Sequence, residues 1–330
     1  MKKLVSMIVI VMLILTFVSI DQKAWGKEEL EMRLAHVMST SHPYHLGATK
    51  FKEIVEEKTG GRIKISIFPG GQLGRQRDLA EMVSAGQIDF CLVWPGVLES
   101  YEPDIGIIYF PFLFRDKEHL LNVINSDIGK DLFSPLEEKG LKVLTVFYNG
   151  EYNILSKESL RYPEDMKGLK MRVPPSPLFV EMGKQLGTVV VTTDFTEVPS
   201  AFQTGGIDAE IQSSINIREG RHYEFAGYLC RVKLAFLVEP LLISFKRFKM
   251  LDGQDQEIIV SAAVEAARYE IDKTEEREFL ADIFLRNKGV EYFTPYYKSE
   301  WKQAVSTLYK DHPEWNILFE KIISLEEAVK

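Results

Sequence analysis

The sequence predicts an α/β protein made of two doubly wound lobes, with a hinge between them and one long helix. Three observations lead to this fold class. Strand and helix patterns alternate between Leu30 and Trp94, a helix-glycine-strand junction occurs twice, and a charge-rich helical pattern runs from Gln254 to about Lys288. The 330 residues, 45% hydrophobic and 27% charged, are enough for two globular domains of ordinary size.

The first lobe begins with a predicted strand over residues 30–37. A helix over residues 41–58 follows, with a proline in its first turn. A strictly alternating strand at 62–68, a helix at 75–85 and a buried strand at 88–94 complete the unit. This β-α-β-α-β order is that of a doubly wound sheet, in which ligands bind outside the carboxyl ends of the strands.

The second lobe repeats this plan between Lys170 and Gln212. The junction at 204–209 matches the earlier junction at 85–90, because a glycine ends a helix and lets a strand begin in each. Two such units that face each other would form a cleft. The elements expected here are a strand at 169–173, a helix at 178–186, a strand at 188–192, a helix opened by Asp194 or Thr196, and a strand from Ile207.

Two strands are predicted to cross between the lobes. The first, Leu141 to Phe147, leads to a crossing at Tyr148-Asn149-Gly150, and the second, Val238 to Phe245, returns. These crossings predict a first lobe of residues 27–149 plus 238–277 and a second lobe of residues 150–237 plus 278–330.

Three further segments complete the predicted fold. The apolar passage from Pro103 to Phe114 is expected to pack under the first lobe, and Lys298 to Lys330 is expected to form two amphipathic helices that cover the second. The long helical pattern from Gln254 to Lys288 exceeds the usual helix length. A coiled coil is the alternative for this pattern, but its heptad is not sustained.

Residues 1–26 have the features of a secretory signal peptide. Lys2 and Lys3 give a positive start, Leu4 to Ile20 is an uncharged apolar run, and Ala24-Trp25-Gly26 offers small residues for cleavage after about Gly26. An uncleaved anchor is the alternative, since about 17 apolar residues is the short limit for spanning a bilayer. No cysteine follows the run, which argues against a lipoprotein.

Export bears on the two cysteines, Cys91 and Cys230. An oxidising compartment allows a disulfide, but sequence does not fix the Cα separation that a bridge requires. Both cysteines lie in apolar strand-like runs, where a buried thiol packs as a small hydrophobe. We therefore predict free thiols.

The net charge restricts the class of ligand. Removal of the leader takes three positive charges and one negative charge from the chain, so the formal charge changes from −8 to −10. An acidic protein without a basic run is a poor candidate for binding nucleic acid. An anionic ligand would therefore be captured by a local positive feature and not by the overall field.

Motifs of catalysis and cofactor binding are missing. The glycine-rich turn at 69–74 has neither the dinucleotide fingerprint nor the phosphate-loop spacing, and no G-x-S-x-G elbow occurs. His36, His42 and His45 are close enough in sequence for a metal cluster, but no carboxylate spacing supports one. We predict a protein that is not an enzyme and has no cofactor or metal.

Arg172 is the leading candidate for capturing an anion. It ends a predicted strand beside the prolines at 174, 175 and 177, so its side chain is expected to face the crevice. Its planar guanidinium can grip a carboxylate at two points. A surface arginine in an ion pair is the alternative.

The motifs around Arg172 follow an ordered pattern. They are Gly168-Leu169-Lys170-Met171-Arg172-Val173-Pro174 with Ser176-Pro177, then Phe195, Glu197, Val198, Ala201, Gln203, Gly205 and Asp208. This pattern closely resembles the solute-binding proteins of tripartite ATP-independent periplasmic (TRAP) transporters, the DctP-type family. Further blocks at 69–74, 111–115 and 163–168 resemble family blocks, so the similarity covers nearly all of the mature chain.

The resemblance implies a fold and a role. The fold would be periplasmic-binding-protein-like, with the long helix spanning both lobes, and the protein would be a receptor in the periplasm. We expect it to be a monomer. It would deliver a small organic acid to the TRAP membrane permease subunits, without inserting stably into the membrane once the leader is cleaved.

The resemblance also implies roles for individual residues. Arg172 would be the carboxylate clamp, Phe195 a ring that packs on the ligand, and Gln212, where the family usually has asparagine, a polar contact. Tyr152 stands near the place of a second arginine that family members often have, so one clamp arginine remains. Trp94, at the end of a first-lobe strand, is expected to face the cleft, with a core position as the alternative.

Three more residues complete the candidate site. Glu239 lies at the return crossing and is expected to favour a ligand amine or hydroxyl, with a satisfied hinge carboxylate as the alternative. Gln76 and Ser176 are the remaining candidate ligand contacts.

One clamp arginine and an aromatic lining predict a monocarboxylate with an apolar or aromatic body. A C4-dicarboxylate or a sialic acid is less favoured, because a second charge would need a second cation. The alternatives are a ligand-sensing module for an amine-bearing or dicarboxylic acid, and a two-lobed periplasmic enzyme.

Overall fold

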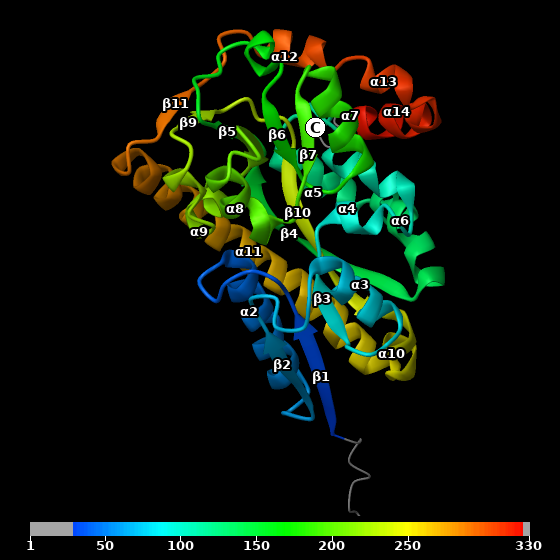
Figure 1. Ribbon diagram of the computed structural model, residues 1–330. Helices are drawn as coiled ribbons and strands as arrows, with labels where there is room; N and C mark the ends of the chain where they lie inside the picture. Colours follow the sequence, from blue (N-terminus) through cyan, green and yellow to red (C-terminus); the bar gives the residue numbers. More distant parts are fainter. Residues whose placement is uncertain (1–28, 326–330) are drawn as a thin grey trace, which may run out of the picture.

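The computed structural model describes residues 29–325 of the chain, and the predicted signal peptide lies outside them (Figure 1). Its first sheet has the strand order β2-β1-β3-β10-β4. β1 is parallel to β2 and β3, whereas β10 is antiparallel to β3 and β4. The strands are β1 (Leu30–Ala35), β2 (Ile63–Phe68), β3 (Phe90–Leu92), β4 (Leu141–Glu151) and β10 (Phe236–Ser244).

The second sheet has the strand order β11-β9-β5-β8-β6-β7. β6 is parallel to β7 and β8, β11 is parallel to β9, and β5 is antiparallel to β8 and β9. The strands are β5 (Asn153–Ser156), β6 (Lys170–Val173), β7 (Val189–Thr192), β8 (Ala209–Gln212), β9 (Tyr228–Cys230) and β11 (Glu291–Phe293). The predicted fold of two mixed α/β units is confirmed.

Helices cover both sheets (Figure 1). They are α2 (Pro43–Lys58), α3 (Gln76–Ser84), α4 (Pro95–Leu98), α5 (Lys117–Asn125), α6 (Asp127–Phe133), α7 (Pro177–Gln185), α8 (Val198–Gln203), α9 (Ser214–Glu219), α10 (Phe245–Met250), α11 (Gly253–Asn287), α12 (Lys298–Ala304), α13 (Leu308–Asp311) and α14 (Asn316–Ser324). Below, the first lobe denotes the first sheet with α2, α3 and α10, and the second lobe denotes the second sheet with α7, α8 and α9. The residue boundaries of the lobes stay a prediction.

Two long strands connect the lobes. β4 stays paired with β10 as far as Glu151, so the predicted crossing at Tyr148-Asn149-Gly150 lies inside a strand and not in a loop. Pairing with β10 keeps the backbone groups of this stretch hydrogen-bonded. The chain enters the second sheet just after Tyr152, where β5 begins.

The predicted long helix is confirmed as α11, which has 35 residues. Its first half packs on α2 and β4, and further along it contacts α9 of the second lobe. Figure 1 shows it running from the α10 side of the first lobe to the β11 edge of the second. Buried residues at Ile259, Ala262 and Ala266 follow the helical period that anchors it to the first lobe.

The carboxyl-terminal segment differs from the prediction of two helices that cover the second lobe. It forms three short helices, α12 to α14, and its last five residues lie outside the described part. Asp311 accepts a hydrogen bond from Gln185 of α7, and Tyr309 donates one to the carbonyl of Pro111. The segment therefore covers both α7 and the 103–114 passage.

Other short elements also depart from the prediction. The helix expected from Asp194 or Thr196 begins as a 3₁₀ turn at Phe195–Glu197 and continues as α8. β5 and β11 were not predicted, because runs of four and three residues carry too little periodicity. Cys91 and Cys230 are buried free thiols, as predicted.

Gly47 tests the contact between α2, β4 and α11. A Cβ added at this position would lie 2.7 Å from the ring of Phe147 and 2.8 Å from Cβ of Glu270. We expect Gly47→Ala to lower the free energy of unfolding by about 1–3 kcal/mol, because the packed elements must move apart. Urea unfolding measures the change.

Gly253 gives the matched control, because no described atom lies within 4 Å of an added Cβ there. Gly253→Ala should leave the free energy of unfolding unchanged or raise it by up to about 1 kcal/mol. Equal losses in the two variants would contradict the close packing of Gly47.

Candidate functional site: a cleft between the lobes

A cleft of about 480 Å³ opens between the two lobes. Its first-lobe wall is built from segments that follow β1, β2 and β3, and its second-lobe wall from segments at the ends of β6, β7 and β8. These are the carboxyl ends of parallel strands, where α/β sheets bind ligands. Seven of the eight candidate residues line the cleft: Arg172, Phe195, Gln212, Trp94, Tyr152, Gln76 and Glu239.

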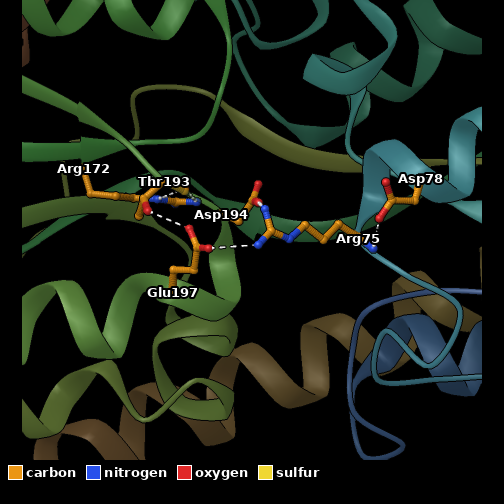
Figure 2. Close-up of polar contacts among 6 residues, drawn as sticks. All are labelled: Arg75, Asp78, Arg172, Thr193, Asp194 and Glu197. Carbon is orange, nitrogen blue, oxygen red and sulfur yellow. Dashed lines mark hydrogen bonds and ion pairs between the residues drawn. The ribbon is translucent and has the colours of Figure 1, made fainter.

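Arg172 is the next-to-last residue of β6 and is 2% exposed. Its Nε and Nη2 donate to the carbonyl oxygen of Thr193 at 3.0 and 2.9 Å, as Figure 2 shows. Its Nη1 is buried without a hydrogen-bond partner among the described residues. Burial lowers the pKa of the guanidinium, while the nearby Glu210, Tyr152 and Asp194 act in the opposite direction.

The Thr193 carbonyl fixes the plane of the Arg172 guanidinium. It occupies the edge formed by Nε and Nη2, so the edge formed by Nη1 and the second hydrogen of Nη2 is left for another acceptor. That edge has the geometry that receives both oxygens of a carboxylate. No ion pair with a described carboxylate satisfies the cation, so the site is arranged to receive an anion.

Arg75 links the two walls, a contact that no sequence motif indicated. It precedes α3 in the first lobe, and its guanidinium lies 3.3 Å from Asp194 Oδ2 and 3.3 Å from Glu197 Oε1 in the second (Figure 2). Glu197 in turn accepts a hydrogen bond from the hydroxyl of Thr193 at 3.0 Å. The residue that holds Arg172 is therefore itself connected to the opposite lobe.

An aromatic cluster forms the floor of the cleft. The ring of Trp94 lies 5.1 Å from that of Tyr109 and 5.8 Å from that of Phe179, and Tyr152 meets Phe179 edge to face at 5.2 Å. Trp94 is 8% exposed, so it is both a core residue and a lining residue. Gln76 supports it, because the backbone N–H of Trp94 donates to Gln76 Oε1 at 2.6 Å.

The second-lobe wall adds one ring and two amides. Phe195 is partly buried and packs on the ring of His222 at 5.2 Å. Gln212 accepts hydrogen bonds through Oε1 from the backbone of Ser213 and from Asn216 Nδ2, both at 2.9 Å. Asn216 also lines the cleft.

Glu239 lies on β10 and is 3% exposed. Burial raises its pKa to about 8, and the interaction with the Glu270 carboxyl group acts in the same direction. Glu270 is fully buried on α11, accepts from the backbone N–H of Tyr148 at 2.9 Å and from Thr274 at 2.7 Å, and has its pKa raised to about 8 by burial. At neutral pH Glu239 is therefore mainly a neutral carboxylic acid that can donate a hydrogen bond.

Ser176 is the candidate that does not line the cleft. Its hydroxyl accepts from the backbone N–H of Phe179 at the start of α7 and lies 3.1 Å from the hydroxyl of Tyr109. The expected ligand contact is corrected to a helix cap, which a serine before an N1 proline commonly provides.

Several polar lining residues were missed, among them Arg75, Arg77, Asp194 and Asn216. Arg75 and Arg77 follow the glycine-rich turn at the carboxyl end of a predicted strand, which is a signal that could have identified them. Their presence means that Arg172 is not the only arginine in the lining.

The described residues contain no group of three or more His, Cys, Asp or Glu side chains that could hold a metal ion. His36 and His45 contact each other through their ring nitrogens at 3.1 Å, whereas His42 bonds to Asn216. Among the described helices, none is long and apolar enough to cross a bilayer.

The family profile of the bacterial extracellular solute-binding proteins, family 7 (DctP), matches residues 34–314. The chain belongs to this family. Family 7 proteins are receptors of TRAP transporters that bind small organic acids and work with a membrane permease, so this chain is a solute receptor and not an enzyme. The family assignment made from the sequence motifs is confirmed.

Individual relatives agree with the family assignment. The 2,3-diketo-L-gulonate-binding periplasmic protein YiaO of Escherichia coli is 28% identical over 281 residues, which are 85% of this chain and 86% of YiaO. A TRAP periplasmic solute-binding protein from Roseobacter denitrificans, solved with β-D-glucuronate, has a TM-score of 0.85 and 26% identity, with 88% of this chain and 98% of that chain covered. Another from Xanthobacter autotrophicus, solved with β-D-galacturonate, has a TM-score of 0.84, 28% identity and the same coverage.

Glu239 makes the stability of this family 7 receptor depend on pH. Its pKa is raised from 4.5 to about 8 on folding, so the native state binds more protons than the unfolded state across this window. The stabilisation that Glu239 contributes is fully present below pH 4.5, the pKa in the unfolded state, and is lost as the pH rises through about 8, the pKa in the folded state. We expect wild type to lose more stability between about pH 6 and about pH 9 than Glu239→Gln does.

Urea unfolding at the two pH values measures this difference. Glu257→Gln, at an exposed position of α11, is the control and should follow wild type. An identical pH dependence in wild type and Glu239→Gln would contradict the raised pKa.

Proposed function

We propose that this receptor captures a monocarboxylate in the cleft, with Arg172 as the clamp for the carboxylate. The observation that carries the proposal is the unpaired, buried guanidinium edge of Arg172 beside the cleft. Leaving Nη1 of a buried cation without a hydrogen-bond partner costs free energy, and a ligand carboxylate would remove that cost by using the free edge. Thr193 holds the guanidinium in place beforehand, so little ordering is needed on binding.

The charges of the lining support a ligand with a single negative charge. Three arginines, at 75, 77 and 172, face three carboxyl groups, those of Asp78, Asp194 and Glu239. Since burial raises the pKa of Glu239 to about 8, the lining has a formal charge near +1 at neutral pH. Arg75 is matched by Asp194 and Glu197, which leaves it a weak competitor for the ligand.

The polar and aromatic parts of the lining favour a hydroxylated body with one apolar face. Sugar rings offer C–H groups that can pack on Trp94, and hydroxyls that can bond to amides such as Gln212 and to Glu239. The Roseobacter and Xanthobacter proteins were solved with hexuronates, which have this character. We therefore rank hexuronates first, and an apolar or aromatic body stays the alternative prediction.

The proposed action is reversible capture without chemical change. The acid enters between the lobes, Arg172 holds its carboxylate, and rotation about the crossing strands β4 and β10 removes it from water. After export by the leader at residues 1–26, the loaded receptor would meet the TRAP permease in the periplasm. A sensing role for the same module is the alternative, and neighbouring permease genes would decide between them.

The arginine clamp is tested by two substitutions of one residue. Arg172→Ala should abolish the binding of D-glucuronate, because the only buried cation of the lining is lost. Arg172→Lys should bind weakly, at least about tenfold below wild type, since an ammonium cannot reproduce the two-point geometry. Isothermal titration calorimetry measures both affinities.

Arg268→Ala removes an exposed arginine on the surface of α11 and serves as the control for lost charge. It should bind as wild type does. Unchanged affinity in Arg172→Ala would remove Arg172 from the clamp role.

A panel of acids tests the proposed ligand class. D-glucuronate and D-galacturonate should bind most tightly, an aryl monocarboxylate of similar size less tightly, and succinate at least about tenfold more weakly than the uronates. The reason is that a second carboxylate would have to compete with Asp194 and Glu197 for Arg75. Succinate binding about tenfold more tightly than every monocarboxylate would overturn the proposal.

A further inference from the structure

A chain of buried polar side chains connects the start of α2 in the first lobe to the cleft wall of the second. Its members are His42, Asn149, Asn216 and Gln212, which are 0–4% exposed. Asn149 lies on the crossing strand β4, and Asn216 and Gln212 both line the cleft. This row of hydrogen-bonded side chains therefore runs from the first lobe, past the crossing strand, to the two amides that line the cleft, those of Asn216 and Gln212.

Two backbone amides, one at each end, orient the hydrogen bonds that connect His42, Asn216 and Gln212. At the first end, the backbone N–H of Tyr44 donates to Nδ1 of His42 at 3.1 Å. Since Nδ1 accepts, the neutral ring must have its hydrogen on Nε2. Burial lowers the pKa of His42 to about 4, in agreement with a neutral ring.

The hydrogen on Nε2 of His42 sets the orientation of the next residue. It donates to Oδ1 of Asn216 at 3.0 Å, and Nδ2 of Asn149 donates to the same oxygen at 2.7 Å. Because Oδ1 of Asn216 faces these two donors, its Nδ2 is directed at Oε1 of Gln212, 2.9 Å away.

The other end of the chain agrees with this direction. The backbone N–H of Ser213 also donates to Oε1 of Gln212, at 2.9 Å. Because Oε1 of Gln212 accepts from both Ser213 and Asn216, it is not available to a ligand. The NH₂ group of Gln212 is therefore the part of the amide that can bond to a ligand in the cleft.

Asn149 alone does not fix the direction, because its amide can turn over. Its Oδ1 is buried without a hydrogen-bond partner among the described residues, so a turned Asn149 would satisfy that oxygen by accepting from a turned Asn216. His42 opposes this turn, because its Nε2–H would exchange the Asn216 oxygen at 3.0 Å for the oxygen of the turned Asn149 at 3.3 Å. The turn is also opposed from the other end, because Oδ1 of a turned Asn216 would face Oε1 of Gln212.

We infer that His42 is a positioning residue for ligand selection: its Nε2–H, acting through Asn216, makes Gln212 present a hydrogen-bond donor to the cleft. The ligand group opposite Gln212 is therefore an acceptor, such as a carboxylate or hydroxyl oxygen, and not an amine. The inference rests on the proposed function for the presence of a ligand, but the hydrogen bonds from His42 to Gln212 are formed in the ligand-free protein.

Two substitutions of His42 separate its two nitrogens. Asparagine places an acceptor near the position of Nδ1, so His42→Asn keeps the helix cap but loses the donor to Asn216. Glutamine places an NH₂ group near the position of Nε2, so His42→Gln keeps that donor but weakens the cap. A residue that served stability alone would not separate affinity from stability in this way.

The first measurement uses ligand-free wild type. Long-range ¹⁵N–¹H correlation spectra should show the Nε2–H tautomer for His42 at neutral pH. A ring with its hydrogen on Nδ1, or a protonated ring, would overturn the inference whatever the receptor binds.

The second measurement is the affinity for D-glucuronate by isothermal titration, together with urea unfolding. His42→Asn should bind roughly tenfold more weakly than wild type, whereas His42→Gln should stay within about threefold of wild type while losing more stability. Equal affinities in His42→Asn and wild type, or a loss in His42→Gln as large as that in His42→Asn, would overturn the inference.

Arg172→Ala separates this inference from the function on which it depends. If wild type and Arg172→Ala bind D-glucuronate equally, the clamp proposal fails, whereas the tautomer of His42 is read without ligand and decides the side-chain chain independently.

Discussion

The interaction on which this site depends is the pair of hydrogen bonds from the Arg172 guanidinium to the carbonyl of Thr193. A carbonyl oxygen orients the cation but does not neutralise it, so the positive charge stays available in a dry environment. A carboxylate in the place of that carbonyl would have consumed the charge and closed the site to an anion. Under the proposed function, a dipole as partner allows this buried arginine to act as the receptor group.

Elsewhere in the cleft lining, a protonated acid leaves the positive charge of Arg172 without a further negative charge to offset it. The buried acid of the cleft lining, Glu239, is mainly protonated at neutral pH because burial raises its pKa to about 8, and Glu270 adds to the effect. Glu270 also bonds the backbone of Tyr148 to α11, so the same buried acid stabilises the crossing strand. The chemistry of the cleft and the mechanics of the hinge thus share residues.

Sequence reasoning reached the parts of the structure that have a local signature. Alternating strands, helix-ending glycines and the motif around Arg172 predicted the fold, the long α11 and seven of the residues that line the cleft. Ser176 was misassigned because the same Ser-Pro pair also opens a helix, and α7 begins there. The links from Arg75 to Glu197 and from His42 to Asn216 join residues 122 and 174 positions apart, and no local periodicity reports such pairs.

The Arg75 link has a consequence for the medium in which the receptor works. Its side chain is 67% exposed and those of Asp194 and Glu197 are 40% and 46% exposed, so dissolved ions reach all three. At physiological ionic strength the screening length is about 8 Å, and it shortens as salt rises. The Arg172–Thr193 contact is buried and escapes this screening. Higher salinity would therefore weaken the Arg75 contacts between the two lobes while leaving the Arg172–Thr193 hydrogen bonds unchanged. The lifetime of the closed, ligand-bound state would then depend on the surroundings as well as on the protein.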